Sequence, residues 1–394
     1  MSDSIAHDLY AVLESTRGTT PTASPAFAKI RNTTCGLAVA KDSFKSEEAN
    51  SDRGVRDVRH GAINPSGPIN FELSYGSFDT YLEAVLGGTW TSKATITGTT
   101  LAAVAADNTI TDSGNGFVTA GFEVGDRVTV SGFTGDVANN ATMILTAVAA
   151  GTLTFGGTDG DVIADDAAGE SVTITTDADE LKIGTTRRYF TILRHQTDQS
   201  VKPYHLFTGC EFDSFNLTVP TQGMVTGDFN VMGHNGLPYA NLNSLTTPTL
   251  GVAGTTSPFD SFTGTITEGG SGLALATEIS LAFTNSLATR NIIGSNLSIA
   301  PSIGQADITA NLTAYFDDTT LMEKFLNETS SALIFTLVDP SSNQYTFNLP
   351  SIKYTGAPYE TSAQGTIPQA LPVQALYDTT QASALVITRL PVAS

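Results

Sequence analysis

The 394-residue sequence has few basic residues, two cysteines and no long apolar run. Lys and Arg total 19 against 39 Asp and Glu, a formal charge of −20. This imbalance argues against a protein that grips nucleic-acid phosphates, because a negative surface repels them. No apolar run approaches the roughly eighteen residues that span a membrane, and MSDSIAHDLY lacks a basic region before an apolar core. We therefore expect a soluble chain without membrane insertion or an export signal.

The two cysteines, Cys35 and Cys210, lie far apart and lack the CxxC spacing of zinc or redox sites. We expect two small buried apolar residues rather than a disulfide.

Catalytic signatures are also missing. There is no HExxH, GxSxG, Walker loop or GxGxxG after a strand, and Gly269 to Gly272 form a plain turn. The five histidines, His7, His60, His195, His205 and His234, show no metal-ligand spacing. A Ser, His and Asp triad need not be adjacent in sequence, so a hydrolase stays an alternative without identifiable residues. We predict no catalytic residue, metal or cofactor.

One acidic cluster, Asp159, Asp161, Asp165 and Asp166, offers the oxygen ligands that Ca²⁺ requires. It lacks the full loop pattern with a terminal Glu, so solvated turn carboxylates are the preferred interpretation.

What the sequence does contain is β-strand patterning. Charged residues are only 15% of the chain, and 36 glycines with abundant Thr, Ser and Ala favour many short strands joined by turns. In the body, alternation predicts the strands Ser214–Val219, Val225–Met232, Glu278–Phe283, Ile308–Phe316, Leu333–Val338 and Tyr345–Leu349. The last two flank a turn, so we expect a hairpin in which Leu333, Phe335 and Leu337 share a face. Residues 235–262 lack periodicity and are predicted as a long loop or arm.

The most specific pattern spans residues 59–90, which we interpret as a loop, a strand, a short helix and a stop. Ile69, Phe71, Leu73 and Tyr75 alternate with Asn70, Glu72 and Ser74, as in a strand with one buried face. A helical apolar stripe follows at Phe78, Tyr81, Leu82, Val85 and Leu86. We expect Ser77 to cap this helix, Asp79 to suit its positive end, and Gly87 and Gly88 to end it.

A similar strand and helix recur at residues 308–326, ITANLTAYFDDTTLMEKFL, with paired apolar residues Leu321, Met322, Phe325 and Leu326. Two copies of one supersecondary unit would give a pseudo-symmetric body.

Residues 94–180 differ from the rest. They carry 13 acidic residues and one basic residue, Arg127, and so contribute −12 of the net charge. Short strands are predicted at Arg127–Val130, Met143–Val148, Thr152–Phe155 and Ser171–Thr175, and GFEVGDRVTVSGF resembles the first corner of a small SH3-like barrel. The aromatics Phe117, Phe122, Phe133 and Phe155 fit its core. We predict an inserted β domain at 94–180 and a discontinuous body at 1–93 and 181–394.

The body resembles bacteriophage tail tube proteins. The resemblance rests on ELSYGSFD and the Gly-Thr-Trp end in residues 59–90, on GTTPTASPAFAKIR at 18–31, and on residues 207–233, and it continues through LTAYFDDTTLMEKFLNETSSALIFTLVDP, YTFNLPSIKYTG and LPVQALYD. It implies a mainly β subunit, a sandwich with one or two short helices. Six subunits would close into a ring around a channel, and rings would stack into the tube that delivers the phage genome. Implied partners are further copies, tape measure, and tail terminator or tail tip proteins, with DNA passing unbound. The implied location is the virion tail, after assembly in the host cytoplasm.

Residues 41–61 mix both charges densely. The resemblance implies a long loop that reaches a neighbouring subunit or ring, where complementary ion pairs would set register. The candidate contact residues are Lys41, Lys45, Glu47, Glu48, Arg53, Arg56, Asp57 and Arg59, with Asp42 and Asp52 beside them. The alternative is a solvated loop whose ion pairs contribute about 0 to 1 kcal/mol each.

The insertion should face outward, because six extra domains would not fit inside the channel, and this favours a long, non-contractile tail. The alternative function is a β-rich adhesin or carbohydrate-binding protein whose site lies in the insertion.

Overall fold

The computed structural model describes residues 3, 5–48, 52–156, 163–243, 245–273, 275–359 and 366–392. The fold is mainly β, and the described chain contains three α-helices. The chain forms two compact units. The larger unit comprises Met1–Gly88, Ile183–Ser341 and Asn348–Leu385, and the smaller comprises Thr89–Lys182, Ser342–Phe347 and Val386–Ser394. In the described residues, no helix has the length and apolar character needed to cross a membrane.

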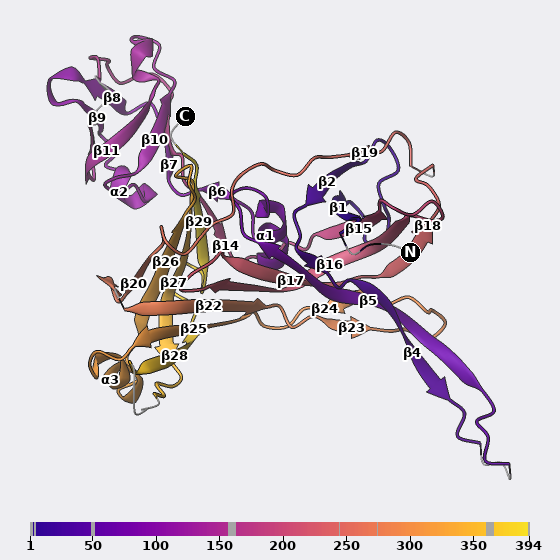
Figure 1. The fold of residues 1–394 in the computed structure, drawn as a ribbon. Coiled ribbons are helices and arrows are strands. Elements are labelled where there is room, and N and C mark those ends of the chain that lie inside the picture. The colour runs from indigo at the N-terminus through magenta and orange to yellow at the C-terminus, as the bar shows by residue number, and fades with distance from the viewer. Residues whose placement is uncertain are drawn as a thin grey trace. The chain divides into compact units, whose positions relative to one another are not determined.

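The larger unit is built from antiparallel strands and two helices (Figure 1). Its first elements are β1 (His7–Glu14), β2 (Ala26–Ile30), β3 (Thr34–Cys35), β4 (Ala38–Lys45), β5 (Val58–Glu72), α1 (Asp79–Leu86), β15 (Tyr189–Gln196), β16 (Tyr204–Val219), β17 (Thr226–Met232), β18 (Asn235–Tyr239) and β19 (Thr249–Leu250). Its later elements are β20 (Thr265–Glu268), β21 (Ser271–Gly272), β22 (Ala276–Thr284), β23 (Ala288–Arg290), β24 (Ile299–Ser302), β25 (Asp307–Tyr315), α3 (Thr320–Leu326), β26 (Ser331–Val338), β27 (Gln344–Tyr354) and β28 (Pro368–Ala375). The start of β27, up to Phe347, belongs to the smaller unit.

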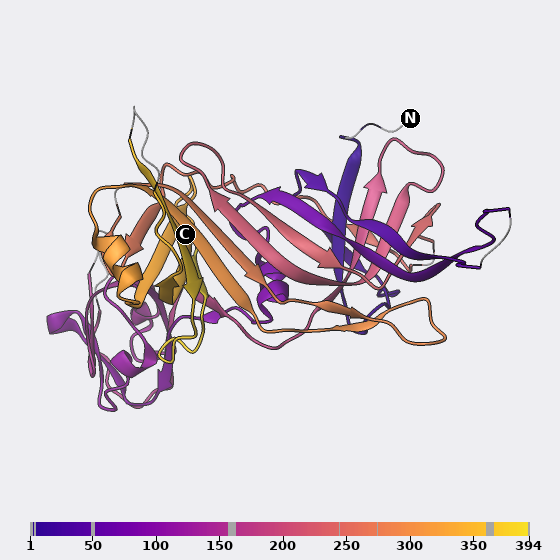
Figure 2. The same ribbon diagram turned by 90° about the horizontal axis from the view of Figure 1, so that it is seen from below.

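One long sheet organises this unit. Its strands follow the order β4, β5, β17, β16, β22, β25, β28 and β27, each antiparallel to the next. The short β3 also pairs with β5, beyond the end of β4. Figures 1 and 2 show β5, β17 and β16 side by side, followed by β22, β25 and β28.

Strand β16 belongs to two sheets. Its first residues, 204–208, pair with β15 on one side and β18 on the other. Its later residues pair with β17 and β22. Strand β1 lies outside β15, and β2 lies outside β1.

The apolar face of the long sheet forms the core. Phe71, Phe215 and Phe229 are at most 1% exposed, and Phe71 lies 4.8 Å from Phe229 between ring centroids. Helix α1 covers this face with four buried residues, Tyr81, Leu82, Val85 and Leu86, as the helical stripe predicts. Tyr81 packs 5.4 Å from Phe212 of β16.

The ends of α1 confirm part of the sequence prediction. Asp79 lies in the first turn and Gly87 is the left-handed C-cap, with φ of 65°. The prediction that Ser77 caps the helix was wrong. Phe78 is the N-cap, and the Ser77 hydroxyl instead accepts a hydrogen bond from Ser74 at 2.9 Å.

The strand before α1 begins earlier than predicted, and it ends at Glu72, before the predicted strand residues Leu73 and Tyr75. Residues 59–68 were expected to form a loop, yet β5 begins at Val58 and ends at Glu72. The first half alternates poorly because it contains Gly61, Pro65 and Gly67, and pairing with β4 rather than a buried face keeps it extended.

The other body strands lie where alternation places them, in β16, β17, β22, β25, β26 and β27, although Val225 precedes β17 and Phe316 follows β25. Leu333, Phe335 and Leu337 are all at most 2% exposed, so they share a face as expected. The predicted loop at 235–262 was partly wrong, because β18 and β19 lie within it.

The smaller unit contains a separate seven-stranded sheet, ordered β7, β13, β10, β11, β12, β9 and β8. Its elements are β6 (Thr91–Ser92), β7 (Thr95–Gly98), β8 (Leu101–Val104), β9 (Thr109–Asp112), α2 (Phe117–Ala120), β10 (Arg127–Ser131), β11 (Thr142–Ala149), β12 (Thr152–Phe155), β13 (Val172–Thr176), β14 (Asp179–Lys182) and β29 (Val386–Leu390). The four predicted core aromatics are at most 4% exposed and pack in one cluster. Arg127 pairs with Asp177 and donates to the Pro391 carbonyl at 2.8 Å.

Candidate functional site: the polar sheet face and the hairpin arm

The face of the long sheet opposite the core is lined by rows of small polar side chains. Strand register sets one row across neighbouring strands: Thr34, Asn70, Asp228, Asn216, Ala282, Thr309, Gln374 and Lys353. A second row runs through Glu72, Thr226, Thr218, Ser280, Asn311 and Pro372. We call these two rows the polar face. It alternates with the buried residues of the same strands, because successive side chains point to opposite sides of a sheet.

The polar face carries little charge. Of its members, Glu72 and Asp228 are acidic and Lys353 is basic. The Asn216 amide donates to both Asp228 carboxylate oxygens, at 3.1 and 3.3 Å. Most other members are Thr, Ser, Asn or Gln, which can exchange hydrogen bonds with water but cannot neutralise a phosphate. The surface can therefore lie beside nucleic acid without holding it.

Sequence reasoning identified the alternation of these strands but not the polar face. The signal was available in the polar positions of each strand, such as Thr309 and Asn311 between Ile308, Ala310 and Leu312. Which strands lie side by side was not available, because β16 and β22 are distant in sequence.

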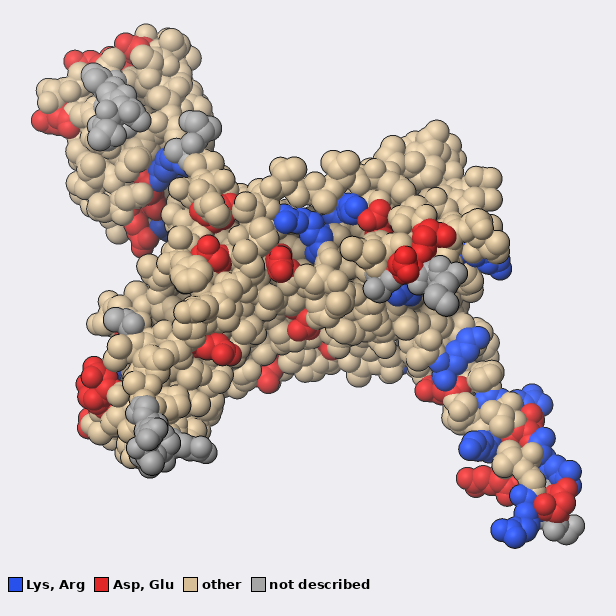
Figure 3. All heavy atoms as spheres, in the orientation of Figure 1, with Lys and Arg blue, Asp and Glu red and all other residues tan. Residues whose placement is uncertain are grey.

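The charged segment at 41–61 forms a hairpin arm, defined here as residues 38–66 (Figure 1). The prediction of a loop was wrong for its two sides, since β4 pairs with β5 from Lys45 and Val58 back to Ala38 and Ser66. Residues 49–51 at its end lie outside the described residues. Figure 3 shows Lys, Arg, Asp and Glu gathered along this arm.

The arm brings the predicted contact residues together on one exposed projection. Lys41 and Lys45 lie on β4, Arg59 lies on β5, and Glu47, Glu48, Arg53, Arg56 and Asp57 lie between the strands. All eight are exposed. Arg56 pairs with Asp52 at 2.7 Å and Arg59 with Asp57 at 2.9 Å. In the described chain, Lys41, Lys45, Glu47 and Arg53 make no ion pair.

Apolar side chains are exposed on the same arm. Phe44 is 62% exposed, Val55 61% and Val58 49%. Exposed apolar residues beside mixed charges are a composition suited to a protein contact.

The remaining candidates for chemistry are separated or partly outside the described residues. Asp159 and Asp161 lie outside them, Asp165 accepts from the Ala105 amide, and Asp166 accepts from the Asp136 amide. The described residues contain no group of three His, Cys, Asp or Glu placed to hold a metal. Both cysteines are free; Cys210 is buried as predicted, whereas Cys35 is only partly buried. Burial raises the pKa of the Cys210 thiol and lowers that of His205.

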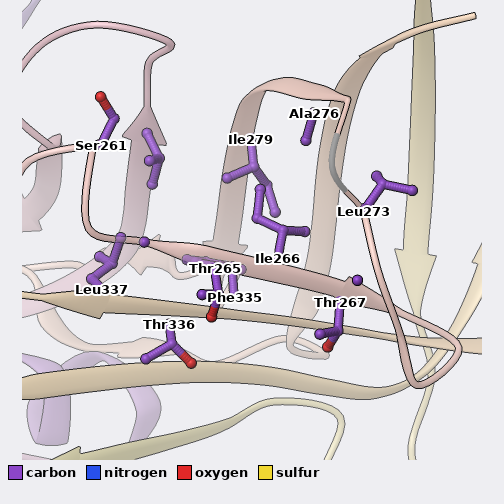
Figure 4. A pocket seen from close by; sticks show the side chains of 13 residues that line it. Ser261, Thr265, Ile266, Thr267, Leu273, Ala276, Ile279, Phe335, Thr336 and Leu337 are labelled. Carbon is purple, nitrogen blue, oxygen red and sulfur yellow. The ribbon is translucent and has the colours of Figure 1, made fainter.

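An apolar pocket of about 650 Å³ opens between β20 and β26 on one side and β16 and β22 on the other (Figure 4). Ile266, Leu273, Ile279 and Phe335 line it, and among the described residues around it the polar side chains are Ser and Thr hydroxyls. Those described residues supply no acid or base for the hydrolase alternative.

Comparison with known families matches the family model described as phage tail tube protein to residues 6–183 and 166–375. The two matches together reach over most of the chain. The first runs across residues 94–180, outside the segments on which the sequence resemblance rests. Among curated proteins, none matches this chain closely enough to count as a relative.

Proposed function

The chain belongs to the phage tail tube protein family, whose members are structural proteins of the virion tail that assemble into a tube, and we propose that its copies close into stacked rings. The sequence resemblance implies six subunits in each ring; we propose a ring with six positions, each of which contributes one sheet to the channel wall. The stacked rings form the conduit through which the genome enters the host.

The polar face carries this proposal. A conduit for DNA needs a wall that water wets and phosphates do not grip, since each Lys or Arg contact would slow sliding. The polar face extends over seven of the eight strands of the long sheet, all but β4, and over the short β3, and it has two acidic residues and one basic residue. We therefore propose that it lines the channel, with the apolar face and α1 turned into the wall.

The arm is the proposed contact with a neighbouring subunit or ring. Reversing Arg53, Arg56 and Arg59 to Glu should stop tube growth in purified protein, as seen by negative-stain electron microscopy. The matched control replaces the same residues with Lys, which keeps the charge, and should form tubes. Normal tubes from the Glu variant would show that the arm does not make this contact.

The division into a body at 1–93 and 181–394 and an insertion at 94–180 stays a proposal, with the insertion facing outward on a non-contractile tail. Deleting residues 94–180 should then leave tube assembly intact. A deleted protein that folds but forms no tubes would show that these residues take part in assembly.

Tape measure and tail terminator or tip proteins are further proposed partners, met in the host cytoplasm during assembly. A tagged chain should capture them from infected cells, and capture of neither would count against this part. The alternative function, a carbohydrate-binding protein, predicts dispersed monomers that bind glycans through 94–180.

A further inference from the structure

We infer that the larger unit contains two copies of one structural unit, so that a ring with six positions holds three chains. Repeat one comprises β1–β5, α1 and β15–β18, and repeat two comprises β20–β28 with α3. This inference rests on the proposed ring assembly and specifies how many chains build it.

The two repeats share their order and their pairing. In each, a long hairpin leads into a helix: β4 and β5 precede α1, and β22 and β25 precede α3. Of the strands that follow the helix, β15, β16 and β17 of repeat one correspond in order to β26, β27 and β28 of repeat two. Strand β17 pairs with β5 and β16, and β28 pairs with β25 and β27. Outside them, β1 pairs with β15 and β20 pairs with β26. The sequence similarity of residues 69–86 and 308–326 falls at equivalent places.

Within one chain, the repeats join through a single strand pair. Residues 214–219 of β16, the last strand of the sheet in repeat one, pair with 279–284 of β22, the first strand in repeat two. Each repeat therefore has two edges of different sequence: one is equivalent to residues 214–219 of β16, and the other to residues 279–284 of β22. A contact between two different edges is heterologous, and repeating it produces a closed ring when the rotation allows closure.

The same two edges recur, unused, at the ends of the long sheet. Ile69 and Ile308 are equivalent positions in the two repeats. Cys35 pairs with Ile69, and Phe283 of β22 pairs with Ile308, so residues 32–36 correspond to the edge of β22. The other end is residues 351–355 at the end of β27, because Lys353 pairs with Gln374 and Gln374 with Thr309, as Asn216 pairs with Asp228 and Asp228 with Asn70. In the described chain, backbone bonds of 32–36 go to β5, and those of 352–355 go to β28. We assign 351–355 of one copy as the partner of 32–36 of the next, with Lys353 opposite Thr34 as Asn216 lies opposite Ala282 within the chain.

The hairpin of repeat two shows what the arm would contact. Residues 288–302, which include β23 and β24, lie against repeat one: the Ile63 amide donates to Asn296 at 2.8 Å, and Arg17 donates to the Ser298 carbonyl at 3.0 Å. His234, just after β17, also contacts the Ser298 carbonyl at 2.7 Å.

The corresponding place in repeat two is an open pocket of about 670 Å³. Residues 305–308 before and within β25 and 374–377 at the end of β28 line it, and Tyr377 is 66% exposed. The arm of a neighbouring copy is its proposed occupant.

The number of chains sets the diameter of the barrel. Eight strands from each of three chains give about 24 strands, which close into a barrel about 48 Å across at about 4.8 Å spacing and 40° tilt. Six chains would double this to about 96 Å, and a single chain of eight strands would leave an interior filled by side chains.

Cysteine cross-linking tests both the edge pairing and the count. In a Cys35→Ser background, Thr34→Cys and Lys353→Cys together should cross-link under mild oxidation into a ladder that ends at three chains on a denaturing gel. Each single variant is the matched control and should give no ladder. A ladder that ends at six chains, or tubes that form without cross-links, would overturn the inference.

Native mass spectrometry of unmodified rings provides a second count that does not depend on a variant. Three chains of 41.1 kDa give about 123 kDa, whereas six give about 247 kDa. A protein that forms no rings would contradict the proposed function itself, which separates that failure from a wrong chain count.

Discussion

At the scale of single residues, Gly67 determines how closely two strands approach. Its φ is +151°, and a Cβ built there would lie 2.3 Å from the Gly36 carbonyl oxygen. Gly36 follows β3 at the sheet edge proposed to pair with the next copy. Its amide donates to the Pro68 carbonyl at 2.7 Å. The backbone of this edge is therefore positioned by the absence of a side chain.

We predict that Gly67→Ala lowers the free energy of unfolding by at least about 3 kcal/mol, because it adds both backbone strain and a clash with backbone atoms. The control is Gly76→Ala, where φ is +73° but nothing lies within 4 Å of the new Cβ. It should cost only about 1 to 2 kcal/mol. Denaturant unfolding measures both; equal costs would show that the close approach is unimportant.

A second residue-scale prediction concerns pH. Lys29 of β2 pairs with Asp8 of β1 at 2.7 Å and lowers the pKa of that carboxyl, chiefly through their hydrogen bond. A lowered folded-state pKa stabilises the fold above the unfolded value near 3.9, and this contribution disappears as pH falls through the lowered pKa. In a double-mutant cycle of Asp8→Asn and Lys29→Met, unfolding should show a coupling of about 0.5 kcal/mol at pH 7 and none at pH 2. Coupling that persists at pH 2 would contradict this origin.

At the scale of elements, the two helices occupy equivalent places but differ in burial. Four residues of α1 are buried, whereas none of α3 is. Lys324 holds α3 to β20 through Glu268 at 2.6 Å, and Tyr354 donates to the same carboxylate at 3.0 Å. An ion pair thus takes part of the role that apolar packing has in α1.

We predict that Leu82→Ala in α1 destabilises the folded chain by about 2 to 5 kcal/mol, because it leaves a cavity. Leu326→Ala in α3 should change stability by less than about 0.5 kcal/mol, since that side chain is 67% exposed. Thermal or denaturant unfolding of unassembled protein distinguishes the two. A large cost at Leu326 would show that α3 is packed more tightly than its exposure indicates.

The elements also show what sequence could predict. Strict alternation placed most strands of the long sheet, and the apolar stripe placed α1, because each signal comes from residues close in sequence. The arm was missed as a hairpin because β4 is exposed and its residues do not alternate with a core. The polar face was missed because it depends on pairs such as Asn216 with Ala282. The similarity at 308–326 indicated a repeat, but the correspondence of β16 with β27 leaves no comparable sequence trace.

At the scale of the whole molecule, the polar face should control how freely DNA moves. Adding two lysines there, Thr309→Lys with Asn311→Lys, should slow genome release by about tenfold, because new phosphate contacts must break as DNA advances. Both residues are exposed in the chain. The control, Ala147→Lys, adds charge at an exposed position of the seven-stranded sheet. Release of DNA from purified phage carrying each variant measures the rate; unchanged release from normal tubes of the double variant would place the polar face outside the channel.

The account as a whole depends on whether the chain forms a hollow tube with the polar face inside. Electron cryomicroscopy of protein assembled at high concentration tests this most directly. We predict tubes of stacked rings whose wall is a continuous barrel, with Asn216, Thr309 and Asn311 pointing into the channel. Monomers that remain dispersed, or tubes whose channel is lined by other residues, would contradict it.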